Sequence, residues 1–233
     1  EYRATGIHMA LSPQADLATE PRWPRFTATF GADPVSVSRL AGAYVAGFQG
    51  SPKGLTSNGV ATVAKHWVGY GAQPEGFDGH NYYGRFAKLD NASFAQHVAA
   101  FNDALANNTA GIMPTYPILT GVTLEGRPLE QVAAGFNRQI LTDLLRKQKG
   151  FKGFILSDWA ITNDCPVACS APTAALPQTA AAIATPWGVE TLTKLERFAK
   201  GVNAGIDQFG GVTDTAILLE AVNTGKLSVE RID

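Results

Sequence analysis

A carboxylate and an indole stand together at the end of a short apolar run in this chain. The run 154–156 leads through Ser157 directly into Asp158 and Trp159. A run of this length, set off by a glycine, is typical of a strand buried on both faces. Because ligands bind at the carboxyl ends of parallel strands, Asp158 could be a reacting group beside a stacking platform. A strand-end Asp can also cap a following helix, and this segment alone leaves both interpretations open.

Polar residues also follow the other segments that have the pattern of a strand. These strand-end residues are Asp16 with the segment 21–25, Lys65 with His66, Tyr116, Asp158 with Trp159, and Asp207 with Gln208. Such a set suits a sugar, because cations donate to hydroxyl groups while indole rings stack on apolar faces. Singly, each residue has a structural interpretation: Arg22 could bond a loop carbonyl, Lys65 could pair with a buried acid, and His66 could be a satisfied core histidine. Their joint placement favours a carbohydrate site.

The segments that would position these residues alternate between strands and helices. Strands are expected at 6–11, 59–67, 110–116, 154–156 and 205–208. Helices are expected at 33–48, around 94–105, and at 136–149, 192–203 and 213–223, with one more beginning at 228. Asp33 followed by Pro34 is a typical helix start, and the basic residues before Gly150 suit a helix end.

Strands that alternate with helices predict an α/β protein with a parallel sheet. An open doubly wound sheet would be expected to carry a glycine-rich phosphate turn after its first strand, but residues 12–25 are rich in Pro, Arg and Trp. A TIM-like (β/α) barrel with long loops on its carboxyl face fits better. Since a complete barrel needs eight strands, we expect residues 1–233 to form a single, incomplete barrel domain whose N-terminal strands lie outside this chain.

The composition predicts a soluble globular unit without a charged macromolecular partner. The 19 basic and 20 acidic residues give a net charge of −1 without long blocks of one sign, which argues against nucleic acid and anionic membranes. No apolar run approaches the roughly 18 residues that cross a bilayer. Cys165 and Cys169 lack the nearby His or Cys of a zinc site, so we expect neither a metal nor a cofactor. The two cysteines could form a disulfide, favouring a periplasmic or secreted setting, or remain free thiols.

Three motifs, in this order, resemble those of the family 3 glycoside hydrolases. They are PRWPR at 21–25, KHW at 65–67 and SDW at 157–159, which are similar to the family's PRWGR, KHF and SDW. FGADP at 30–34 resembles FGEDP, and the LLR-x-x-x-GF-x-G run before the strand 154–156 is also similar, so the resemblance covers nearly the whole chain. In place of the family's glycine and glutamates this chain has Pro24, Ala28 and Ala32, which indicates a subgroup.

The resemblance implies roles for most of the strand-end residues. It implies that Asp158 is the nucleophile, that Tyr116 lies near it, that Trp159 lines the subsite, and that Arg22, Lys65 and His66 bind the sugar hydroxyls. A retaining glycosidase needs a second carboxyl group about 5 to 5.5 Å away to protonate the leaving oxygen. In two-domain members this acid/base is a glutamate of a second domain, which we expect to lie outside residues 1–233, as does a sugar-binding aspartate upstream.

A local candidate for the acid/base lies in the glycine-rich loop 70–85. Asp78 and His80 are similar to the Asp-Ser-His element of the family's β-N-acetylglucosaminidases, but their offset from Lys65 is longer and the expected PGHG reads VGYG. We therefore expect this pair to bind or orient sugar. The resemblance favours a retaining enzyme that releases glucose from the non-reducing end of β-glucosides or β-glucans. The alternatives are a β-N-acetylhexosaminidase using Asp78 and His80, and a non-catalytic sugar-binding barrel fragment.

Overall fold

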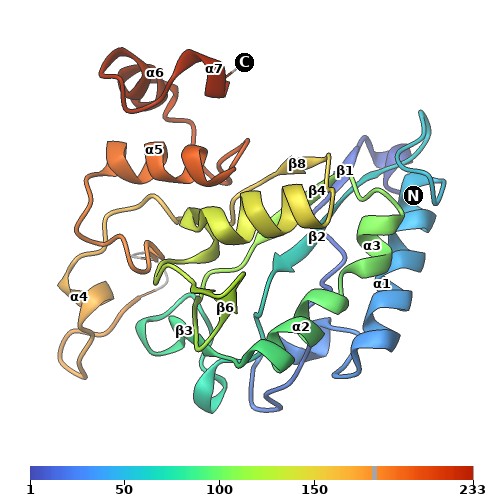
Figure 1. The fold of residues 1–233 in the computed structure, drawn as a ribbon, viewed down its shortest axis with the longest axis horizontal. Coiled ribbons are helices and arrows are strands. Elements are labelled where there is room, and N and C mark those ends of the chain that lie inside the picture. Colours follow the sequence, from blue (N-terminus) through green and yellow to red (C-terminus); the bar gives the residue numbers. More distant parts are fainter. Residues whose placement is uncertain (180–182, 233) are drawn as a thin grey trace.

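The computed structural model describes residues 1–179 and 183–232, and four parallel strands form its centre (Figure 1). The strand order is β1-β2-β4-β8. Their bounds are β1 Met9–Ala10, β2 Ala61–Trp67, β4 Gly111–Pro114 and β8 Phe154–Ile155. All three pairings are parallel, which confirms the expected α/β class and four of the expected strands. In the expected fifth strand, 205–208, only Gln208 pairs, in a parallel bridge with Leu156.

The parallel strands are covered by helices, as the two-sided burial of β4 requires. The α-helices are α1 Pro34–Gln49, α2 Asn91–Ala99, α3 Asn102–Ala106, α4 Val167–Ser170, α5 Lys194–Ala204, α6 Thr215–Asn223 and α7 Val229–Ile232. The π-helix η6 spans Gln139–Gln148, and short 3-10 turns lie at Arg3–Thr5, Phe26–Ala28, Pro74–Gly76, Tyr82–Gly84 and Ala134–Phe136. In Figure 1, α6 and α7 lie beyond α5, away from the strands.

The sheet has two separate edges in the part of the chain described. There β1 pairs with no strand other than β2, and the bridge of Leu156 to Gln208 ends the opposite side. A closed eight-stranded ring is therefore not formed by residues 1–179 and 183–232. Within the same residues, none of the helices is both long and apolar enough to span a membrane.

Local capping explains where the main helices begin. The side chain of Asp33 accepts a hydrogen bond from the Ser36 amide (2.8 Å), as the Asp-Pro start predicts. Thr193 and Glu196 form a reciprocal capping box at the start of α5. The single helix expected around 94–105 is instead divided between α2 and α3, so that expectation was wrong in detail.

Four short strands were not expected from the sequence. β3 (Phe86–Lys88) pairs in parallel with β5 (Ile118–Thr120), and β6 (Thr123–Leu124) forms an antiparallel hairpin with β7 (Arg127–Pro128). Glu125 and Gly126 form the hairpin turn, both with positive φ (51° and 75°). Such a two-residue turn suits the twist of a hairpin, but strands this short show too little alternation to be recognised.

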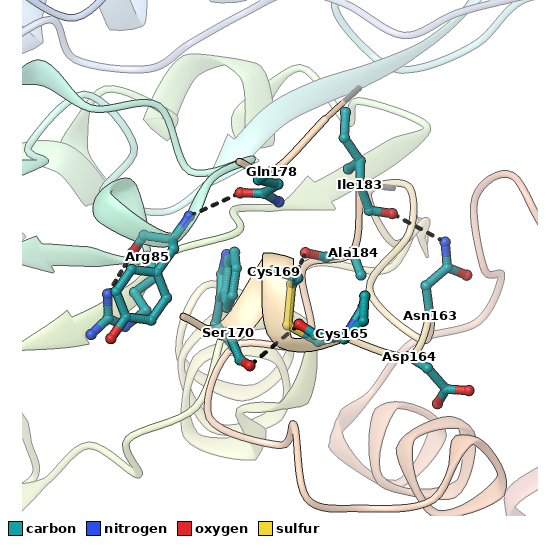
Figure 2. The surroundings of a disulfide bond; sticks show 12 residues. Arg85, Asn163, Asp164, Cys165, Cys169, Ser170, Gln178, Ile183 and Ala184 are labelled. Atoms are coloured by element: carbon teal, nitrogen blue, oxygen red, sulfur yellow. Dashed lines mark hydrogen bonds between the residues drawn. A yellow bond between two sulfur atoms is a disulfide. The ribbon is translucent and has the colours of Figure 1, made fainter. Parts of the chain in front are cut away.

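The two cysteines form a disulfide between Cys165 and Cys169, with Cα atoms 5.2 Å apart, so the free-thiol alternative was wrong (Figure 2). The bond links Cys165, two residues before α4, to Cys169 within α4, so three residues lie between the cysteines. Cys169 is fully buried and belongs to an apolar cluster that also contains Tyr116 and Trp187. The burial of Cys169 therefore anchors this short disulfide loop in the interior.

A buried histidine on α2 makes the stability of the domain dependent on pH. His97 is 1% exposed, and burial lowers its pKa to about 4. In the unfolded chain the pKa is about 6.5, so between these values the unfolded state binds the proton and the folded state does not. Stability should fall as the pH is lowered from about 6.5 to 4, by about 3 kcal/mol from this residue. His97→Gln should flatten that part of the profile in urea unfolding, whereas exposed His8→Gln should leave it unchanged. An unaltered slope in His97→Gln would contradict this assignment.

Candidate active site

Asp158 lies at the end of β8 with one carboxylate oxygen bonded and the other free. Its Oδ1 accepts from the Trp159 amide (2.8 Å), whereas Oδ2 is buried and has no hydrogen-bond partner among the described residues. The nearest charged or ring nitrogen recorded is His66 Nε2, at 3.5 Å from Oδ2. The residues after Asp158 form turns, and the next helix, α4, begins only at Val167. The helix-cap interpretation was therefore wrong.

His66 is fixed by the carboxylate of Asp16, which is itself buried. Asp16 Oδ1 accepts from the His66 backbone amide (2.9 Å), and Asp16 Oδ2 accepts from the ring Nδ1 (2.7 Å). With Nδ1 as the donor, Nε2 is left as an acceptor. The Arg25 guanidinium, which can only donate, fills this role at 3.2 Å. His66 Nε2 therefore lies near both the Arg25 guanidinium and Asp158 Oδ2.

Arg25 lies in the cluster that Asp16, His66 and Asp158 form. Arg22, the arginine singled out from the sequence, does not. Arg25 also contacts Tyr70, with Nη1 3.3 Å from the hydroxyl and the guanidinium 5.1 Å from the ring centroid. The Arg22 side chain is 58% exposed and pairs with Glu20 and Glu75 at the surface. Both arginines belong to one five-residue motif, and no property of the sequence distinguishes which of them turns inward.

Lys65 is half buried at the end of β2 among charges of both signs. Burial lowers the pKa of its ammonium group, as does the Arg25 charge, while the carboxylates of Asp158 and Asp16 oppose this shift. No hydrogen bond of the ammonium group is recorded within the described residues. Its donors are thus available to a ligand that sits between the lysine and the two carboxylates.

Tyr116 and Trp159 form the walls beside the carboxylate. The Tyr116 hydroxyl donates to the Trp159 carbonyl (3.0 Å), and burial together with the Asp158 charge raises its pKa well above the ordinary value. Trp159 is 41% exposed, and its ring lies against the backbone of Gly210 and Gly211. A Cβ on either glycine would come within 2.6 Å of the indole, so only glycine permits this contact. Trp159 is thereby held as an exposed platform, as a stacking role requires.

Asp78 and His80 form a hydrogen-bonded pair above Tyr116. Asp78 Oδ1 accepts from the amide of His80 (3.0 Å) and pairs with its ring Nδ1, while Asp78 Oδ2 accepts from the Tyr70 hydroxyl (2.9 Å). Burial opposes ionisation of Asp78, but the hydrogen bonds from His80 outweigh it and hold the pKa of Asp78 far below its usual range. The His80 ring lies 4.5 Å from that of Tyr116, which brings the loop 70–85 over the site.

Asp207, another strand-end carboxylate, has a structural role. Its Oδ2 accepts from the Ile155 amide (2.7 Å) and pairs with Arg146 (2.6 Å), so it holds the sheet to η6. Among residues 1–179 and 183–232, no group of three His, Cys, Asp or Glu side chains could hold a metal ion.

Comparison with known proteins assigns the chain to a family. Residues 1–233 match the family described as "Glycosyl hydrolase family 3 N terminal domain". This chain belongs to glycoside hydrolase family 3. The family 3 chain is 54% identical to the "Periplasmic beta-glucosidase/beta-xylosidase" of Dickeya chrysanthemi, covering 100% of this chain and 36% of that protein. It is 39% identical to "Beta-glucosidase C" of Emericella nidulans, covering 100% and 35%. The chain thus spans about a third of the length of these curated relatives.

Solved structures show the same arrangement of strands and helices. The β-glucosidase of Listeria innocua aligns with a TM-score of 0.74 at 26% identity, covering all of this family 3 chain and 28% of its own. A family 3 β-N-acetylglucosaminidase from Paenibacillus sp. str. FPU-7 aligns with a TM-score of 0.70 at 23% identity, which shows the shared fold alone. The mixed α/β chain with its parallel sheet is therefore a portion of the family's N-terminal domain.

Replacing Asp16 with asparagine should destabilise the family 3 domain, because a carboxylate offers two acceptor oxygens and an amide offers one. One of the two buried donors of His66 would lose its partner, and we expect a loss of about 2 to 4 kcal/mol in the free energy of unfolding. Urea denaturation measures this loss. Asp33→Asn is the matched control, since Asn is as good a helix cap and the expected change is below about 0.5 kcal/mol. Equal losses in the two variants would contradict the role of Asp16.

Proposed function

We propose that this chain carries the nucleophile and the sugar-binding groups of a retaining β-glucosidase. The observation that carries the proposal is the Oδ2 atom of Asp158, which is buried at the end of β8 beside an exposed indole and has no hydrogen-bond partner among the described residues. A buried carboxylate oxygen without a hydrogen bond is costly to the free protein, so a ligand-facing role accounts for it. Family membership and the β-glucosidase names of the similar proteins support the substrate class.

In this mechanism Asp158 attacks the anomeric carbon and forms a covalent glycosyl intermediate that water then hydrolyses. Lys65 and Arg25 would donate to the hydroxyl groups of the sugar, His66 would line the same subsite, and Trp159 would stack on an apolar sugar face. Arg25 takes the place of Arg22 in this proposal, because Arg22 is paired with surface carboxylates. Hydrogen bonds that strengthen as charge develops on the ring would lower the barrier.

Parts of the proposed enzyme lie outside these 233 residues. The open edges of the sheet and the coverage of only about a third of the relatives support further strands that complete a (β/α) barrel. We propose that a second domain supplies the acid/base.

The disulfide between Cys165 and Cys169, and the periplasmic relative, support a periplasmic or secreted location.

The Asp78–His80 pair supports a second candidate, a β-N-acetylhexosaminidase that uses this pair as acid/base. The bond between Asp78 Oδ1 and the ring Nδ1 directs the other ring nitrogen, Nε2, away from the carboxylate, and the His80 side chain is 37% exposed. A histidine held by a carboxylate can transfer a proton to a leaving group. We favour β-glucosidase, with this pair orienting sugar, because of the names of the similar proteins.

The role of Asp158 is tested by the substitution Asp158→Asn in the full-length protein. The change keeps the side-chain volume but removes the charge, so folding should survive while hydrolysis of an aryl β-glucoside falls by several orders of magnitude. Asp207→Asn is the contrasting variant and should lose stability rather than turnover. A 2-fluoroglucoside that traps the intermediate should label Asp158. Labelling of Asp78 or Asp207 instead would refute the assignment.

The two candidates for the acid/base are separated by the dependence of rate on the leaving group. If Asp78 and His80 only orient sugar, replacing both with Ala should weaken binding to a similar degree for aryl glucosides with good and poor leaving groups. If the pair supplies the proton, substrates with poor leaving groups should lose far more activity than those with good ones. Hydrolysis of a series of substituted phenyl β-glucosides distinguishes these outcomes, and the same series on an N-acetylglucosaminide tests the alternative substrate.

A further inference from the structure

The loop that carries Asp78 and His80 is held in place from a distant part of the chain. The indole Nε1 of Trp187 donates to the Gly79 carbonyl (2.8 Å). Gln178 donates to the His80 carbonyl (3.1 Å) and accepts from the Tyr82 amide (3.3 Å). These contacts join residues about 100 positions apart, and they fall on the backbone between and beside the two polar side chains of the loop.

Trp187 is itself rigidly placed. Its ring is fully buried in the cluster that contains Tyr70 and Tyr116, and its carbonyl accepts from the Ala133 amide (2.9 Å). Gly188 follows at positive φ and lies so close to Gln131 that a Cβ would meet its carbonyl oxygen at 2.4 Å. The Trp187 indole therefore presents its N–H at a fixed position beneath the loop.

The disulfide lies in the same segment as Trp187 and Gln178. Cys169 Sγ lies 3.3 Å from the carbonyl oxygen of Ala184, three residues before Trp187. Figure 2 shows the disulfide beside Ala184, and Gln178 reaching toward the loop that includes Arg85. The hydrogen bonds of Trp187 and Gln178, together with one from the Tyr83 hydroxyl to the Pro172 carbonyl (3.5 Å), connect the described part of this segment to the loop 70–85.

We infer that Trp187 is a positioning residue for the sugar-binding pair, acting through the Gly79 carbonyl, with Gln178 as its accessory. The inference rests on the proposed function, since it assigns Asp78 and His80 to sugar. Gly79 lies directly between these residues, so a displacement of its carbonyl turns both side chains. A Cβ on Gly79 would lie only 3.0 Å from the Tyr70 ring and 3.2 Å from Pro117, which leaves the loop little room on its other side.

The test is the substitution Trp187→Phe in the full-length protein, with an aryl β-glucoside as substrate. The variant keeps an aromatic ring but leaves the Gly79 carbonyl without its donor, so sugar should bind less well. We expect KM to rise about tenfold while kcat changes by less than about threefold. In a background in which Asp78 and His80 are both replaced by Ala, the same substitution should add no further increase in KM, because the pair that Trp187 positions is gone.

Trp67→Phe is the matched control for the loss of an indole hydrogen bond. The Nε1 of Trp67 donates to the Ile140 carbonyl (3.2 Å) from an equally buried position in the main core. Its loss should lower stability to a similar degree without raising KM. If Trp187→Phe does not fold, Gln178→Ala, which removes the bonds to His80 and Tyr82, should give the same rise in KM and the same lack of additivity.

An unchanged KM in Trp187→Phe, or an equal increase in KM with and without the Asp78–His80 pair, would overturn the inference while the proposed function stands. If the unsubstituted protein does not hydrolyse β-glucosides, the proposed function fails instead. The positioning role is then judged by the NMR signals of the His80 ring. These should shift in Trp187→Phe and stay in place in Trp67→Phe, and unshifted signals in both would refute it.

Discussion

The contact on which the site depends is the two-point bond between Asp16 and His66. One oxygen of this buried carboxylate accepts from the His66 backbone amide and the other from the ring Nδ1, so the contact orients the imidazole and makes Nδ1 its donor nitrogen. Its second nitrogen is left as an acceptor, which draws in Arg25, and Arg25 in turn contacts the Tyr70 hydroxyl. Tyr70 then donates to Asp78. A continuous series of polar contacts thus runs from the end of β1 to the loop above the site.

The members of this series are hydrogen-bonded to one another, whereas several polar groups beside the strand ends, among them Gln14 Nε2 and Thr115 Oγ1, have no partner among the described residues. The ammonium group of Lys65 and one oxygen of Asp158 remain without hydrogen bonds among the described residues, and they lie within the same electrostatic neighbourhood. A half-buried cation and a buried anion interact more strongly than the same charges would in water. The structure therefore separates groups that hold the framework from groups that face a ligand, and the separation follows from donor and acceptor counts.

Much of this arrangement could be predicted from the sequence, for identifiable reasons. The central strands are apolar runs bounded by glycine or by charged residues, and the helix at Asp33 carries its own cap, so both kinds of signal are local. Because both residues follow expected strands, the sequence predicted that His66 and Asp158 lie at the same end of the sheet. Asp16 was recognised as a strand-end residue, but its bond to His66 depends on the parallel pairing of β1 with β2, which is not a local property.

The differences between the expected and the observed arrangement also have physical causes. Arg22 and Arg25 are chemically equivalent in the sequence, and the choice between them is made by a turn in which the intervening Trp23 is fully buried. The splitting of the helix around Ala100 and the short strands β3 and β5 arise from packing between distant segments. The contribution of Trp187 could not be foreseen, because it lies in an irregular stretch with no periodic pattern and acts through a backbone carbonyl.

The unpaired oxygen of Asp158 has a consequence for the thermodynamics of the whole domain. A buried acceptor without a donor makes the ligand-free protein less stable than its packing alone would allow. A ligand that donates a hydrogen bond to this oxygen removes that cost. A sugar that donates to this oxygen stabilises the folded state in proportion to its saturation of the site. The melting temperature of the domain should therefore report on the occupancy of its subsite, and sequences selected only for stability would be expected to lose this carboxylate first.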